Sequence, residues 1–133
     1  MPRIGILCDR DEDRERMKHT IKMLTVRDGF DCSVCSFDQE EAVEWEDITC
    51  IILAWKDRNR AFRFAEKIWN RQQSVFILYV AYQVEDIIAA LGMPFFHIVR
   101  LFGLEQDLEA AFRKMGRVRL SAADRIRFTQ NGQ

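Results

Sequence analysis

The sequence predicts an α/β fold, a doubly wound domain in which helices cover both faces of a five-stranded parallel sheet. Strand-like and helix-like hydrophobic patterns alternate between residues 3 and 116, which is typical of βαβ units. The segment SVFILYVA at 74–81 is apolar on both faces, as a central strand of a parallel sheet is. A chain of 133 residues has the length of one such domain.

The first half of the chain contains three of the predicted strands. Residues 3–8 (RIGILC) form a short apolar strand that ends in the acidic turn DRDED. Apolar residues then recur at helical spacing over 12–28, where an Asp-Gly pair ends the helix. The alternating segment 30–37 (FDCSVCSF) indicates a half-buried edge strand. A short helix over 39–45 leads to the third strand, 48–55.

The second half repeats the alternation twice. A helix over 59–71 carries aromatic and aliphatic residues on one face and leads to the central strand 74–81. A short helix over 85–91 is closed by a glycine. The fifth strand, 94–102, begins with a proline, which is tolerated at a strand start. The last helix, 104–115, has one apolar stripe, and we expect the glycine after it to end it.

The remaining residues differ in character from the domain before them. We therefore divide the chain into a domain, 1–116, and a linker or tail, 117–133. The tail is basic, alternates charged and apolar residues over 125–130, and ends in Asn131-Gly132, a strong signal for a type I′ hairpin turn. Two interpretations stay open: the start of a truncated C-terminal DNA-binding domain, near Leu120, or a solvated tail.

The composition limits the class of protein. The formal net charge is −1, so bulk charge favours binding to neither nucleic acid nor an anionic membrane. The longest apolar runs, 50–55 and 75–82, are far shorter than the roughly 18 residues of a membrane-spanning helix. No charged-then-apolar leader precedes the first strand, so we expect no signal peptide and a cytoplasmic location.

The cysteines all fall in strand-like segments, and two of them have the CxxC spacing of a zinc or redox pair. A zinc site would need a second pair of ligands, and neither His19 nor His97 has a suitable spacing. Strand residues three apart also face opposite sides of a sheet. We therefore expect reduced core thiols, and no metal, at Cys8, Cys32, Cys35 and Cys50.

In a doubly wound sheet the loops after the first, third, fourth and fifth strands converge at one crevice. We therefore expect the candidate site at this carboxyl edge. Its residues are Asp9, Arg10, Asp11, Glu12, Ala54, Trp55, Asp57, Tyr79, Val80 and Arg100. The edge contains no Gly-rich phosphate loop and no Ser or Cys nucleophile elbow, so nucleotide-binding and hydrolase classes are disfavoured.

Two segments resemble response-regulator receiver domains. RIGILCDRDEDRERM, residues 3–17, looks like the first strand and acidic turn of LytTR-type response regulators, and HIVRLFGLEQDLEAAFRKM, residues 97–115, looks like the fifth strand and helix. The resemblance covers residues 3–116. It implies a flavodoxin-like (βα)5 fold with strand order 2-1-3-4-5. It also implies phosphorelay signal transduction in a two-component system and transcription regulation.

The resemblance weakens where the family's chemistry lies. Such receivers phosphorylate an aspartate at the end of the third strand, with two acids for Mg²⁺, a Ser/Thr ending the fourth strand and a Lys ending the fifth. Asp9 matches the first acid. The other positions carry unsuitable residues: Arg10 for the second acid, Ala54 for the acceptor, Tyr79 for the Ser/Thr, Arg100 for the Lys, and His97 for the aromatic switch.

The substitutions predict a degenerate receiver, or pseudo-receiver, that is not an enzyme and needs no cofactor. Ala54 has no oxygen to accept a phosphoryl group, and Arg10 places a cation where a magnesium ligand is needed. We expect Arg10 to pair with Asp9 and Tyr79 to fill the space beside Ala54. Arg100 is expected to pair with Asp9 or a backbone carbonyl.

Other functions stay open. Asp57 could be a displaced acceptor, with Mg²⁺ bound by Asp9 and Asp11 or Glu12. The chain could be a stand-alone adaptor for a partner protein, and His97 could be either a pH-sensitive switch or a structural histidine.

The expected partner is a second copy of the chain. It would dock on the face made by the helix 85–91, the strand 94–102 and the helix 104–115. DNA would be bound only through a missing C-terminal domain, and no membrane is expected. Candidate members of this face are Ile87, Ile88, Phe95, Phe96, His97 and Phe112.

Overall fold

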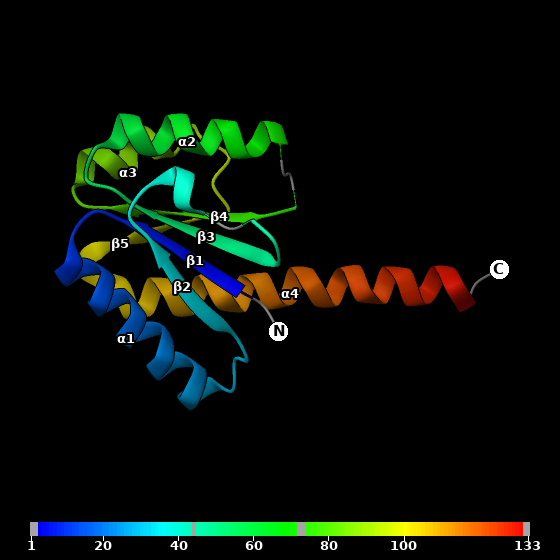
Figure 1. Cartoon of the computed structure of the whole chain (residues 1–133). Helices are drawn as coiled ribbons and strands as arrows, with labels where there is room; N and C mark the ends of the chain where they lie inside the picture. Colours follow the sequence, from blue (N-terminus) through cyan, green and yellow to red (C-terminus); the bar gives the residue numbers. More distant parts are fainter. Residues whose placement is uncertain (1–2, 44, 72–73, 132–133) are drawn as a thin grey trace.

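The computed structural model describes residues 3–43, 45–71 and 74–131, with side chains up to residue 118. It contains one parallel sheet of order β2-β1-β3-β4-β5, which confirms the predicted flavodoxin-like topology (Figure 1). The strands are β1 Arg3–Cys8, β2 Ser33–Phe37, β3 Ile48–Ala54, β4 Phe76–Ala81 and β5 His97–Arg100. The helices are α1 Asp11–Asp28, η1 Glu40–Ala42, α2 Arg58–Arg71, α3 Val84–Ala90, η2 Leu101–Gly103 and α4 Leu104–Asn131.

Helices cover both faces of the sheet, as Figure 1 shows, because the central strands are apolar on both sides. Alternate residues of β3 illustrate this: Ile52 and Ala54 pack with α1 and α4, whereas Ile51 and Leu53 pack with α2. We call these the α1–α4 face and the α2–α3 face. Each face has its own hydrophobic cluster, so the sheet separates two cores.

Several predicted elements are shorter in the structure. The helix expected over 39–45 is only the 3₁₀ turn η1, after which the buried Val43 turns toward the core. The edge strand β2 begins at Ser33, and β5 covers only His97–Arg100. The predicted end of the first helix is confirmed, since Gly29 adopts the left-handed conformation (φ 72°) that a C-terminal glycine permits.

The last helix is longer than predicted. α4 has 28 residues and continues through Gly116 to Asn131, so the expected end at Gly116 and the strand over 125–130 are wrong. One glycine disfavours a helix by only about 1 kcal/mol relative to alanine, and no proline follows to break it. The alternating RIRF segment thus forms part of a helix. The second residue of the predicted hairpin turn, Gly132, lies outside the described residues.

The thiols lie where the strand assignment places them. Cys8 and Cys50 are buried, Cys32 and Cys35 are partly buried, and all four are free. Burial raises the pKa of the Cys8 and Cys32 thiols, which keeps them protonated. In the described part of the chain, no three His, Cys, Asp or Glu side chains converge to hold a metal. Within that same part, no helix has the length and apolar character to cross a membrane.

Candidate functional site

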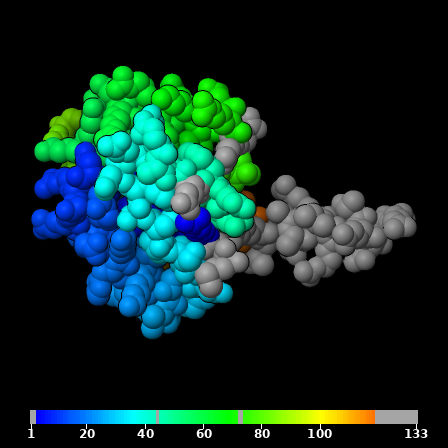
Figure 2. Space-filling view, in the orientation of Figure 1, coloured from blue at the N-terminus to red at the C-terminus, as the bar shows by residue number. Residues whose placement is uncertain are grey.

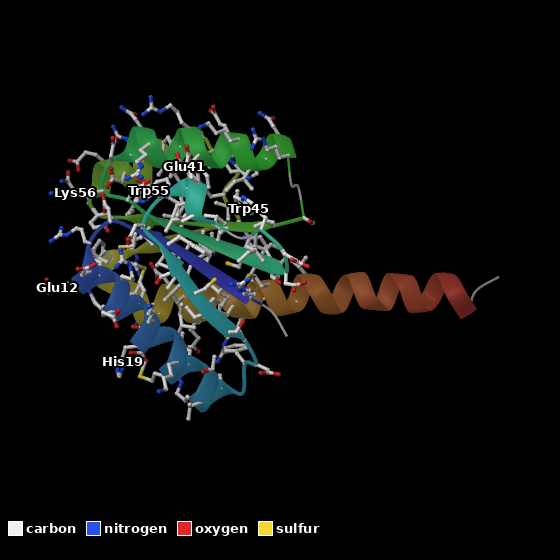
Figure 3. The ribbon with its side chains drawn as sticks, viewed as in Figure 1. Glu12, His19, Glu41, Trp45, Trp55 and Lys56 are labelled. Atoms are coloured by element: carbon white, nitrogen blue, oxygen red, sulfur yellow. The ribbon has the colours of Figure 1, made fainter. Side chains whose placement is uncertain are left out.

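The candidate site lies at the carboxyl edge of the sheet, where Ala54 is the last residue of β3. Cys8 of β1 pairs with Ala54, and Ala81 of β4 pairs with Arg100 of β5, so these strand ends meet at one edge. Ala54 is fully buried. Figure 3 places Glu12 and Lys56 at the same end of the molecule, and both are exposed. The centre of the site is therefore apolar, and its charges lie around it.

A partly buried tyrosine covers the end of β3 with its hydroxyl. Tyr82, the residue after β4, places its Oη 3.0 Å from the Ala54 carbonyl oxygen and 3.2 Å from Asp13 Oδ2. Burial raises the pKa of the Tyr82 hydroxyl, and the nearby Cys8 and Asp13 raise it further. The phenol therefore stays protonated and shares its one hydrogen between the two acceptors.

Asp13 is a central residue of the site that the sequence analysis missed. It lies in the first turn of α1 and is only 8% exposed. It forms an ion pair with Arg10, whose Nε lies 3.5 Å from Asp13 Oδ2. Arg10 thus pairs with Asp13, and the expected pairing with Asp9 is wrong. The signal was available, because Asp13 precedes Met17 by four residues and so lies on the buried stripe of the helix.

A second arginine, Arg14, links three parts of the edge. Its Nη2 donates to the Cys8 carbonyl at 2.6 Å and also contacts Asp38, and its Nη1 donates to Asp11 Oδ1 at 2.7 Å. The Arg14 side chain is 15% exposed, so it is held largely out of water. It ties β1, α1 and the end of β2 together. Asp11 thus forms an ion pair with an arginine at the surface.

The other predicted polar residues have separate surroundings. Asp9 and Glu12 are exposed. Asp57 is also exposed, and its Oδ1 accepts the Arg60 amide hydrogen at an N···O distance of 3.3 Å, at the start of α2. Asp57 thus has the place and bonding of a helix N-cap.

Arg100 forms a fork with Asp107 of α4. Its Nε and Nη2 donate to the two carboxylate oxygens at 2.8 and 2.9 Å, and its backbone N–H donates to Oδ2 at 2.8 Å. The expected pairing with Asp9 or a backbone carbonyl is therefore wrong. Burial opposes ionisation of Asp107, but the hydrogen bonds from Arg100 outweigh it and lower the pKa of that carboxyl.

Tyr79 lies on the opposite face from Ala54. It is fully buried in the α2–α3 cluster, stacked on Phe95 with ring centroids 5.1 Å apart and edge-on to Phe62 at 5.2 Å. It therefore does not fill the space beside Ala54, which belongs to the α1–α4 cluster together with Val80. β4 continues to Ala81, so Tyr79 is two residues from the strand end.

Trp55 also lies on the α2–α3 face. The guanidinium carbon of Arg60 lies 4.0 Å from the centroid of the Trp55 ring.

The arrangement suits charge pairing better than phosphoryl transfer. Asp11, Asp13 and Asp107 each contact an arginine. A cavity of about 340 Å³ above the edge is lined by three aspartates and two arginines together with Gln39. Ala54, at the end of β3, has no side-chain oxygen that could act as a nucleophile. Its backbone carbonyl accepts a hydrogen bond from the Tyr82 hydroxyl.

The predicted interface residues are only partly at the surface. Ile88 is 64% exposed, whereas Phe112 is 5% exposed and Ile87 and Phe95 pack against the α2–α3 core. Phe96 packs against Phe76, with centroids 4.4 Å apart. The sequence analysis missed the other exposed apolar residues here, which are Val84 (60%), Leu91 (72%) and Phe102 (65%).

His97 is partly buried at the start of β5. Burial lowers the pKa of its imidazole, and the Lys114 ammonium lowers it further, against a smaller opposing effect of Asp107. The histidine therefore favours the neutral form.

Comparison with known proteins adds no family assignment. No protein-family model matches the chain, and no curated protein matches it in sequence. The arrangement of the sheet is consistent with a flavodoxin-like or receiver fold.

Proposed function

We propose that the chain is a degenerate receiver domain that transmits a signal through protein–protein contacts without aspartyl phosphorylation. The observation that carries the proposal is the end of β3, where a buried alanine replaces an acceptor and the Tyr82 hydroxyl engages its carbonyl. The strand order supports the receiver interpretation. The resemblance to LytTR-type response regulators favours a role in transcription regulation.

The network around Asp13 supports loss of the metal-dependent reaction. Phosphoryl transfer needs a divalent ion to neutralise developing negative charge, and such an ion needs several free oxygen ligands. Here Arg10 supplies a fixed positive charge to Asp13, and Tyr82 supplies a hydrogen bond to the same carboxylate. Asp13 is thereby already paired with a cation and a hydrogen-bond donor. We infer a constitutive conformation and no enzymatic activity.

The proposed partner is a second copy of the chain, docked on the face formed by α3, β5 and α4. Val84, Ile88 and Leu91 recur at helical spacing and are all exposed, so α3 presents an apolar stripe. Exposed Glu85 lies on α3, and exposed Arg113 and Lys114 lie on α4, across the edge strand. A two-fold axis would therefore bring Glu85 of one copy toward Arg113 and Lys114 of the other. DNA contacts would belong to a further C-terminal domain.

Intact-mass spectrometry after incubation with Mg²⁺ and acetyl phosphate tests the proposal. We expect no added phosphoryl group, under conditions in which a conventional receiver is labelled. A single phosphoryl adduct that disappears in Asp57→Asn would contradict the proposal and favour a receiver with a displaced acceptor. An adduct that persists in that variant would also contradict it and would direct attention to Asp9 and Asp11.

A further inference from the structure

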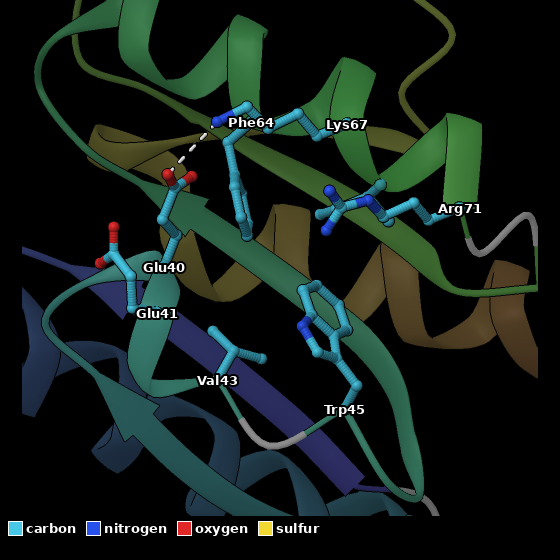
Figure 4. A pocket seen from close by; sticks show the side chains of 8 residues that line it. Glu40, Glu41, Val43, Trp45, Phe64, Lys67 and Arg71 are labelled. Atoms are coloured by element: carbon cyan, nitrogen blue, oxygen red, sulfur yellow. Dashed lines mark hydrogen bonds and ion pairs between the residues drawn. The ribbon is translucent and has the colours of Figure 1, made fainter.

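A second cavity lies away from the carboxyl edge, between the segment joining β2 to β3 and the helix α2. Figure 2 shows these two parts side by side on the surface, in cyan and green, and Figure 4 shows the cavity between them. It has a volume of about 540 Å³ and is lined by Glu40, Glu41, Val43, Trp45, Phe64, Lys67, Ile68 and Arg71. Sites for small organic ligands have about this volume.

The base of the cavity is apolar and partly aromatic. Val43, Phe64 and Ile68 are buried at 8%, 5% and 3% exposure. Trp45 is partly exposed, and its ring lies 6.0 Å from that of Phe64 at an interplanar angle of 31°. A partly exposed indole beside a buried phenyl ring offers a flat apolar surface on which a planar ring can stack.

Only one of the two cations in the cavity is paired. Lys67 Nζ lies 3.3 Å from Glu40 Oε1, and the two close one end of the space. Arg71, one turn further along α2, makes no hydrogen bond or ion pair with any described residue. Its guanidinium extends from α2 over the cavity toward Trp45 (Figure 4). A free guanidinium beside an indole ring is suited to a ligand that combines a planar carboxylate with an aromatic ring.

The acidic wall limits the charge of that ligand. Glu40 is neutralised by Lys67, but Glu41 remains as an exposed negative charge at the cavity. A second negative charge on the ligand would therefore be repelled, which disfavours a phosphate dianion. We propose that this cavity binds a planar aromatic monocarboxylate, with Arg71 as the partner of the carboxylate and Trp45 as the partner of the ring. The proposal is independent of the state of the carboxyl edge.

Isothermal titration calorimetry of the full chain with indole-3-acetate tests the site. We expect saturable binding of one molecule per chain, weakened about tenfold or more in Arg71→Gln, because a charge-assisted hydrogen bond contributes about a factor of ten or more. Trp45→Leu is expected to weaken binding about tenfold. The double variant Glu40→Gln, Lys67→Gln is the matched comparison, since it removes the paired charges of the same cavity without changing its net charge, and binding should change less than threefold. Arg16→Gln, on the exposed face of α1, should leave binding unchanged.

Ligand variants separate the two contacts. Indole-3-acetamide, which lacks the charge, and cyclohexylacetate, which lacks the planar ring, should each bind at least about tenfold more weakly than indole-3-acetate. Phenyl phosphate should bind more weakly than phenylacetate. Circular dichroism of each variant verifies folding. Absence of saturable binding to 10 mM, set as a limit about tenfold above a 1 mM dissociation constant, would overturn the proposal. So would equal binding of the acetate and the acetamide, or unchanged binding in folded Arg71→Gln.

Discussion

Each face of the sheet contains one tyrosine, and the hydroxyl groups of the two tyrosines have different surroundings. On the α1–α4 face, Tyr82 Oη contacts Asp13 and the Ala54 carbonyl, and the neighbouring charges are paired. On the α2–α3 face, the hydroxyl of Tyr79 is buried among rings and finds no hydrogen-bond partner among the described residues. The α1–α4 face is therefore organised by polar contacts at the strand ends, whereas the α2–α3 face is organised by aromatic packing.

The two faces also differ in what they leave available for binding: we call the end of β3 the closed region, because its polar groups are already paired, and the α2–α3 face the open region. The Arg10–Asp13–Tyr82 network leaves little capacity at the end of β3 to bind a further charged group. The α2–α3 face carries the exposed stripe of α3 and the cavity beside α2. The charge-paired strand ends thus lie on the α1–α4 face, whereas the α2 cavity and the apolar stripe of α3 lie on the α2–α3 face.

Ala54→Asp is expected to produce the largest change, because it puts a carboxylate at a fully buried position of the closed region. The free energy of unfolding should fall by about 3 kcal/mol, since a buried charge without a dedicated partner is strongly unfavourable. Urea denaturation measures this change. Asp9→Ala, at an exposed position of the same edge, should change it by less than about 0.5 kcal/mol. A fully stable Ala54→Asp protein would show that the region can still receive an acid.

The two tyrosines provide a matched pair with opposite expected signs. Tyr82→Phe removes a hydroxyl that is bonded to two acceptors and should lower the free energy of unfolding by about 1–2 kcal/mol. Tyr79→Phe removes an unpaired buried hydroxyl and should leave stability unchanged or raise it by up to about 1 kcal/mol. Thermal and urea denaturation of both variants measure the difference. Equal destabilisation would remove the distinction between the two faces.

The fold and the location of the site could be predicted from the sequence, but the exact side chains could not. Alternating apolar and amphipathic segments suffice to define a parallel sheet, and strand order then defines the edge. The segment 75–82 is apolar throughout, so its pattern did not show which of its two tyrosines stands at the strand end. Tyr79 was therefore assigned to the strand end, whereas it lies two residues before it and packs on the α2–α3 face.

Local sequence also could not assign the partners of the arginines. Arg100 and Asp107 are seven residues apart across a turn, and their pairing depends on how α4 begins. Asp13 was recognisable from its spacing to Met17, but charged residues in the first turn of a helix are usually exposed. The tail alternates charged and apolar residues over 125–130, which favours a strand, although the segment is helical. Only the uninterrupted continuation of α4 distinguishes a helix from a strand there.

Ile88→Glu tests whether the exposed stripe is an interface. Ile88 is 64% exposed, so the variant should change the free energy of unfolding by less than about 0.5 kcal/mol. It should nevertheless abolish the proposed dimer, because a carboxylate would be buried at the centre of an apolar contact. Sedimentation velocity at several concentrations measures the oligomeric state. Val26→Glu, at an exposed apolar position on α1, is the control and should remain dimeric. A wild-type chain that stays monomeric would refute the homodimer.

The smallest expected effect concerns His97, on the α1–α4 face beside Lys114 and Asp107. Because the pKa of His97 is lower in the folded chain than in the unfolded chain, the unfolded state takes up a proton first as the pH falls below about 6.5. Folded stability should therefore decrease in that window and show no His97 contribution above it. His97→Gln should remove a few tenths of a kcal/mol of this decrease between pH 7.5 and 5, since the ring is partly solvated. Urea denaturation at both pH values measures it, with His19→Gln on the exposed side of α1 as the control. If His97→Gln retained the full pH dependence, the titrating group would lie elsewhere, and His97 would be a packing residue of β5 rather than a sensor of pH.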